Sequence, residues 1–247
     1  MDNQSREYGQ QNLTLPHDVV PLPSGGIFYK NKKQSVKVGY LTAMDENIIL
    51  GGGSDIASNL LRNKIYEPDF KIDDMLEGDV EAVLIFLRNT SFGPEMTLNL
   101  IDPVTKKEFK ETVLLDQLSI IKGVSPSLDG TFTVTLPKTQ STVKLKPLTY
   151  GEISQLSNTL ESYPQGRVAP KVTLRLQKEI VDIDGATDLG QIAKFIEQMP
   201  IADSKFIRKF MNENEPRLDL IKTIQTPSGE KLTVNVGFGV DFFRPFF

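Results

Sequence analysis

The chain of 247 residues contains 39% apolar and 24% charged residues and carries a formal net charge of −4. Such a composition is typical of a globular protein and argues against wholesale disorder or a fibrous repeat. The absence of cysteine excludes disulfides, thiolate catalysis and cysteine-based zinc sites. A single histidine leaves Ser-His-Asp chemistry and histidine metal sites without their usual groups.

Charge and hydropathy also limit the partners that we expect. The lysines and arginines are spread thinly, whereas phosphate binding needs them concentrated, so we expect no nucleic-acid partner. No stretch reaches the roughly 18 consecutive apolar residues of a membrane helix, and the N-terminus is polar throughout. We therefore expect no membrane span, no Sec-type secretion, and no metal or cofactor.

The chain begins with a polar segment. Residues 1–21 are rich in Gln and Asn and contain His17, and we expect them to form a flexible N-terminal arm. A turn signal follows at Leu22 to Gly26, and the alternation from Ser35 to Leu41 predicts a strand.

Three consecutive glycines, Gly51 to Gly53, precede a predicted helix from Ile56 to Ile65. A glycine run before a helix can cradle a phosphate, and a small-molecule or phosphate-binding enzyme domain is the alternative function that this run suggests. The run lacks the Lys-Ser/Thr of a P-loop and the Gly-x-Gly-x-x-Gly pattern, so we interpret it as a plain loop.

The stretch from Gly78 to Leu118 predicts an apolar helix that ends at Arg88 and Asn89 and leads into a β-hairpin. Arg88 stands next to an apolar core, where its charge needs a partner. That partner is a carboxylate, the backbone carbonyls of the hairpin, or another chain, and Arg88 is therefore a candidate partner-binding residue.

Two pairs of adjacent carboxylates, Asp45-Glu46 and Asp73-Asp74, are the other groups that acid–base chemistry would use. Asp73 and Asp74 directly precede a predicted helix, where the helix dipole favours negative charge. We interpret both pairs as structural and expect no enzymatic activity.

The second half of the chain repeats the plan of the first. Val143 to Thr149 lies over Val36 to Thr42 at a constant offset, and a helix follows each segment, at Tyr150 to Leu160 in the second half. The segment from Lys171 to Val181 fits either a short strand or the start of a helix. Further helices are expected at 189–199 and from Asp203 or Ser204 through Met211, before a final hairpin at 218–238.

These elements predict an α+β fold of two tandem units, each made of short strands, helices and a terminal β-hairpin. The first unit covers residues 22–122 and the second covers residues 131–247, with a Ser-, Pro- and Gly-rich boundary from Gly123 to Gly130.

The second unit ends in an aromatic tail that resembles nothing earlier in the chain. Its large side chains either pack into the protein's own core or contact another subunit, and both interpretations stay open. We therefore take five tail residues as candidate partner-binding residues: Phe242, Phe243, Pro245, Phe246 and Phe247.

Several of these segments, in this order and spacing, resemble the baseplate hub and hub-assembly proteins of T-even-type, contractile-tailed bacteriophages. The matching segments span nearly the whole chain: Leu22 to Gly26 with Tyr29, Leu41 to Glu46, Gly78-Asp79 leading to Arg88, Ser91 to Gly93, Asp116 to Leu118, and Phe242 to Pro245.

The resemblance implies a non-enzymatic protein of phage tail morphogenesis. Such a protein is a component of the baseplate hub or a chaperone for assembly of the hub and tape-measure complex. Its partners would be other hub or tape-measure proteins, and self-association is left open. It would act in the host cytoplasm during assembly and, if it stays, in the tail baseplate.

One departure from the family pattern concerns the hairpin tips. Relatives often carry a Cys-x-x-Cys knuckle of zinc-ribbon type there, whereas this chain has Ile101 to Val104 and Thr226 to Gly229. These groups hold no metal, so the resemblance implies hairpins that are kept by apolar cross-strand packing.

Overall fold

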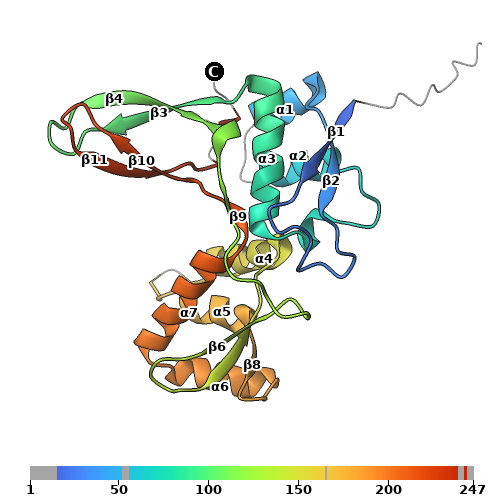
Figure 1. Cartoon of the computed structure of the whole chain (residues 1–247), viewed down its shortest axis with the longest axis vertical. Coiled ribbons are helices and arrows are strands. Elements are labelled where there is room, and N and C mark those ends of the chain that lie inside the picture. The colour runs from blue at the N-terminus through green and yellow to red at the C-terminus, as the bar shows by residue number, and fades with distance from the viewer. Residues whose placement is uncertain (1–15, 52–55, 165, 239–241, 244–247) are drawn as a thin grey trace, which may run out of the picture.

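A computed structural model describes residues 16–51, 56–164, 166–238 and 242–243 (Figure 1). Helices and small sheets occur together throughout these residues, which confirms the α+β class. All described sheets are small: four have two strands and one has three. Figure 1 shows two lobes, one above the other, and an arm of paired hairpins that projects to the left of the upper lobe.

The first lobe is built from both ends of the chain, within residues 16–122 and 217–243. Its elements are β1 (His17–Pro21), β2 (Ser35–Gly39), α1 (Ala43–Gly51), α2 (Ile56–Lys64), η1 (Ile72–Asp74), α3 (Glu77–Phe92), β3 (Glu95–Ile101), β4 (Glu108–Leu114), η2 (Leu115–Gln117), β5 (Ile120–Ile121), β9 (Arg217–Leu218), β10 (Ile221–Gln225) and β11 (Lys231–Asn235).

The second lobe, residues 123–216, is inserted between β5 and β9. It contains β6 (Phe132–Thr135), β7 (Thr142–Leu145), α4 (Tyr150–Glu161), α5 (Lys171–Glu179), β8 (Ile180–Ile183), α6 (Leu189–Gln198) and α7 (Ile201–Asn214). The strands β6, β7 and β8 form an antiparallel sheet in that order, and α5, α6 and α7 bury their apolar stripes against it. The segment from Lys171 to Val181, ambiguous from its sequence, is helix in α5 and strand in β8.

Helix α3 is the centre of the first lobe, as its nearly all-round apolar sequence predicts. The predicted end at Arg88 and Asn89 is wrong, because the helix continues to Phe92. It ends where Gly93 takes a φ of +81° and its N–H donates to the carbonyl of Asn89. A positive φ is cheap only for glycine, so the stop signal is Gly93 rather than the polar pair before it.

The expected tandem units do not describe how the residues pack. The C-terminal hairpin β10–β11 belongs to the first lobe, because Leu220 and Val236 at its root lie in the same apolar cluster as Met96 and Val113 of the first hairpin. The second lobe has its own cluster of buried residues, which no described residue after Met211 joins, and Phe28 of the first lobe packs against both clusters. The two hairpins are similar in sequence, but both belong to the first lobe and do not mark two separate units.

The last residues of the expected N-terminal arm are ordered in the first lobe. Residues 17–21, including His17, form β1, which pairs antiparallel with β2 from His17↔Gly39 to Pro21↔Ser35. Val20 is buried and supplies the apolar anchor that an arm would lack. Residues 1–15 of the expected arm lie outside the described residues.

The described part of the aromatic tail packs into the core of the first lobe. Phe242 and Phe243 are 0% and 3% exposed, and their ring centroids lie 4.8 Å apart in an edge-on arrangement. Phe238 contacts Phe242 in the same way at 4.9 Å. Of the two open interpretations, packing within the protein's own core holds for these two rings.

No helix within the described ranges is both long and apolar enough to cross a membrane.

Replacing Phe242 by alanine should lower the free energy of unfolding by about 3–5 kcal/mol, because it removes a fully buried ring and leaves a cavity. Urea unfolding monitored by circular dichroism measures this loss. Leu128→Ala is the matched control: that side chain is fully exposed in the second lobe, so its loss should change stability by less than about 0.5 kcal/mol. An unchanged midpoint for Phe242→Ala would place the tail outside the core.

Candidate functional site

The glycine run offers no described phosphate site. Gly51 is the last residue of α1, and Gly52 and Gly53 lie outside the described residues. The greater part of the run on which the phosphate-binding alternative rests therefore lies outside the described residues.

The first carboxylate pair is structural at Asp45. Its Oδ2 accepts hydrogen bonds from the N–H and hydroxyl of Thr42 and lies 2.5 Å from Lys64 Nζ in a buried ion pair between α1 and α2. Burial opposes ionisation of Asp45, but the bonds from Lys64 and Thr42 outweigh it and lower the carboxyl pKa. In the second pair, Asp73 faces Arg62 at 3.4 Å on the surface.

The loop that contains Ser24 and Tyr29 meets the start of α3 in the core, and both segments belong to the phage resemblance. Asp79, in the first turn of α3, accepts hydrogen bonds from Ser24 N–H at 2.9 Å, Ser24 Oγ at 2.6 Å and the Tyr29 hydroxyl. Tyr29 Oη in turn accepts from Leu76 N–H at 2.8 Å. Burial raises the pKa of both Asp79 and Tyr29. This buried network fixes the 22–30 loop to α3.

Arg88 uses the second of its three expected partners, the hairpin carbonyls. Its guanidinium donates to Gly93 O and, at 2.5 Å, to Glu95 O, and it lies 5.9 Å from the centroid of the Phe242 ring. Arg88 is 1% exposed, and burial lowers its pKa. The side chains of Arg88, Phe242 and Phe243 thus have no surface for a partner, while Pro245, Phe246 and Phe247 lie outside the described residues.

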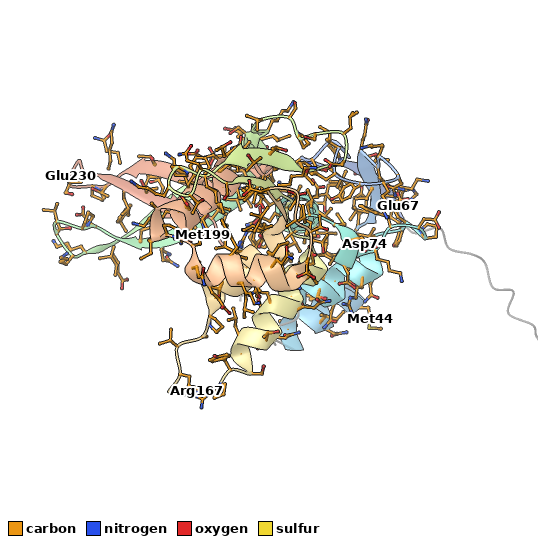
Figure 2. All side chains as sticks on the ribbon, turned by 90° about the horizontal axis from the view of Figure 1, so that it is seen from below. Met44, Glu67, Asp74, Arg167, Met199 and Glu230 are labelled. Carbon is orange, nitrogen blue, oxygen red and sulfur yellow. The ribbon has the colours of Figure 1, made fainter. Side chains whose placement is uncertain are left out.

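The feature best suited to binding is the paired-hairpin arm, which we define as β3–β4 and β10–β11 with their tips. Both hairpins leave the first lobe together and extend away from it (Figure 1). Glu230, in the tip of β10–β11, lies at the far end of the molecule (Figure 2). Each sheet of the arm has two strands, so every strand has one edge without a strand partner among the described residues.

Burial alternates along all four strands of the arm, so each hairpin has one covered and one open face. The covered positions are mainly large and apolar: Met96, Leu98, Leu100, Phe109, Val113, Ile224, Leu232 and Val234. The open face is mostly Thr, Asn, Glu and Lys, but it also carries exposed apolar side chains at Ile101, Val104 and Ile221. These are anchors that a partner protein can bury.

The tips of the two hairpins are joined by Asp102. Its carboxylate accepts from Val104 N–H and Thr105 N–H in its own tip, and from Ser228 N–H and Ser228 Oγ in the other, at 2.9–3.1 Å. Burial alone would raise the pKa of Asp102, but these bonds outweigh it and lower that pKa to about 2. The carboxylate thus holds both tips in place across the neutral pH range.

Only part of this arm is predictable from the sequence. The Asp-Pro pair at 102–103 is a residue combination that starts turns, but the bond between Asp102 and Ser228 joins residues 126 positions apart and has no local signature. Within the described ranges, no group of three or more His, Asp or Glu side chains has the arrangement to hold a metal ion.

Asp102→Asn should loosen the tips, because an amide cannot accept all four hydrogen bonds and also carries no charge. We expect the amide protons of Val104, Thr105 and Ser228 to exchange at least tenfold faster in the variant. The exposed Asp116, which follows β4, provides the control Asp116→Asn.

In the unchanged protein, the protection of these amide protons against exchange should depend on pH. Because the folded pKa of Asp102 is lowered, its contribution is complete above the ordinary value of 3.8 and is lost as pH falls toward about 2. Protection that disappears already near pH 4 would contradict the assigned network.

Comparison with known proteins gives this chain no relatives: no family model, no curated protein and no solved structure matches it.

Proposed function

We propose that this chain is a non-enzymatic protein of phage tail morphogenesis. It acts in the baseplate hub or as a chaperone for assembly of the hub and tape-measure complex, and it binds other hub or tape-measure proteins rather than nucleic acid. The phage assignment rests on the sequence resemblance. The binding role rests on the paired-hairpin arm.

The arm carries the proposal because its geometry serves contact better than chemistry. The arm extends from a packed lobe, and each of its strands has one edge without a strand partner among the described residues. At its end, the exposed fractions of Ile101 and Val104 are 60% and 62%. An edge strand can accept an extended segment of a partner through main-chain hydrogen bonds, and exposed apolar side chains beside it add affinity.

The tips give a second line of support. In a zinc ribbon two Cys-x-x-Cys knuckles share one metal ion, which holds the two tips together. The segments compared with those knuckles, Ile101 to Val104 and Thr226 to Gly229, lie side by side here and are joined through Asp102 and Ser228. Hydrogen bonds between the tips through a carboxylate are compatible with a ribbon-type arrangement that contains no metal ion.

Substituting the exposed anchors of the arm should abolish partner binding without unfolding the protein. In Ile101→Asp/Val104→Asp, two apolar contacts become charges that a protein interface would have to desolvate. We expect at least a tenfold loss in capture of purified hub and tape-measure proteins, with an unchanged circular dichroism spectrum.

Val168→Asp is the matched control, since Val168 is 95% exposed but lies in the second lobe, away from the arm. Equal capture by the arm variant and the unchanged chain would refute the role of the arm. Failure of the unchanged chain to capture any tail protein would refute the phage assignment itself. The presence of the polypeptide in purified tails separates a permanent component from a chaperone.

A further inference from the structure

The joint between the lobes is formed by the start of α3 and by the strand that returns from the second lobe. The chain leaves the first lobe along β5 and returns to it along β9. These two strands pair with each other at only two residue positions. Gly78 lies so close to this return strand that a Cβ atom there would come within 2.3 Å of the Pro216 carbonyl. Backbone thus meets backbone at the joint.

Charged side chains from both lobes converge beside this contact. The first lobe contributes Glu77 and Glu81 from α3 and Arg217 from β9, and the second lobe contributes further groups from α5, α7 and the residue after α7. Together they line a small cavity and an adjoining open groove: Glu77, Glu81, Arg175, Glu179, Lys205, Arg208, Lys209, Glu215 and Arg217.

Carboxylates in this cluster are poorly compensated. Glu81 Oε2, Glu179 Oε2 and Glu215 Oε1 are all shielded from solvent, and none has a hydrogen-bond donor among the described residues. Arg175 donates to the other oxygen of Glu179 at 2.6 Å, whereas no ion pair within 4.0 Å joins Glu81 or Glu215 to a described cation. A buried carboxylate without such a partner is held most cheaply in its protonated form.

The pKa values agree with this geometry. Burial, followed by repulsion from Glu77, raises the pKa of Glu81 from 4.5 to about 7. Burial also raises the pKa of Glu215 to about 7, with Glu179 and Glu77 adding repulsion and Arg175 and Arg217 opposing it.

We propose that the joint is a proton-dependent switch, in which protonation of Glu81 and Glu215 holds the two lobes together and their ionisation lets the lobes separate. With both groups neutral, the other carboxylates of the cluster are Glu179, which is buried, and Glu77, which is exposed, and they face Arg175 and Arg217. Burial raises the pKa of Glu179 as well, and Arg175 opposes that rise. With both ionised, four carboxylates face the same two guanidinium groups.

Among the other cations nearby, Arg208 and Lys146 act on Glu179, where they oppose the rise of its pKa. Lys205, Arg208 and Lys209 lie along α7 at the open groove and not in the small cavity. Lys146 is paired with Glu152, and α4 and the loop before it contribute apolar Ile153, Pro147 and Leu148 to the cavity.

The cavity and the short β5–β9 pairing explain how ionisation of the two glutamates would open the joint. The cavity has a volume of about 40 Å³, more than the roughly 10–15 Å³ that admits water. Ionised carboxylates gain most by hydration, and opening the joint supplies it. The short β5–β9 ladder, the contacts of η1 and α3 with α4, and the ring contact between Phe28 and Phe132 then hold the lobes.

Two spectroscopic labels can measure the movement in the full chain, which contains no native cysteine. Met44→Cys on α1 and Leu189→Cys on α6 place one label on each lobe, at sites 73% and 75% exposed. We expect the distance between the labels to increase and its distribution to broaden between pH 5.5 and 8.5, with a midpoint near the pKa of about 7.

Glu81→Gln/Glu215→Gln in the labelled chain imitates the neutral side chains and should keep the pH 5.5 distance at every pH. Glu213→Gln, an exposed glutamate of α7, is the control and should leave the transition unchanged. A transition that persists in the double variant, or a constant distance in the unchanged chain, would overturn the switch. So would loss of helical circular dichroism over the same range, because the lobes would then unfold rather than separate.

The free energy of unfolding provides a second test, because the direction of its change with pH is defined. Because the folded pKa values of Glu81 and Glu215 are raised, the free energy of unfolding should fall as pH rises from about 4.5 to about 7 and then level off. The double glutamine variant should lose most of this slope. A slope equal to that of the unchanged chain would show that these glutamates do not control the joint.

Discussion

The buried carboxylate of Asp79 is the interaction on which the rest of the first lobe depends. A charge with no exposed surface is tolerable only when donors surround it, and Ser24 and Tyr29 supply three. Because those donors come from the loop between β1 and β2, the carboxylate fixes that loop, and with it the small sheet, against the first turn of α3. The Tyr29 hydroxyl also binds Leu76 N–H, next to the Met75 carbonyl that receives Tyr150 N–H from the second lobe. One polar network thus sets the position from which both lobes are built.

Local periodicity predicts most elements of this fold, because the side-chain repeat of a helix or a hairpin lies within a short window. It predicts the presence of α3, α4, α6 and both hairpins of the arm, although α3 continues past its predicted end to Phe92. It cannot predict which elements share a core, since that depends on contacts between distant segments. The C-terminal hairpin therefore looked like the end of a second unit, although Leu220 and Val236 pack with Met96 and Val113. The same limitation applies to β1, which is expected from its sequence to belong to a flexible arm and forms a strand by pairing with β2.

The candidate site shows the same division between local and distant signals. Asp102-Pro103 indicates a turn, yet the carboxylate gains its function from Ser228 in the other tip. Arg88 at the end of an apolar helix predicts a need for acceptors, and the hairpin carbonyls meet it. Glu81 is one of several charged residues of α3 and carries no distinctive local signal, and only the fold brings it near Glu215. Burial and proximity, which no sequence window contains, determine the chemistry of all three.

Helix α3 connects the joint to the arm, so the two features are not independent. Its first turn contacts Pro216 and Arg217 at the joint, and its last turn holds the root of β3 through Arg88. The second hairpin has a different attachment, because β9 passes directly into β10 through Asp219 and Leu220. The two hairpins are therefore anchored to the first lobe through different elements. They meet at their roots, where Leu220 and Val236 pack with Met96 and Val113, and at their tips, where Asp102 binds Ser228.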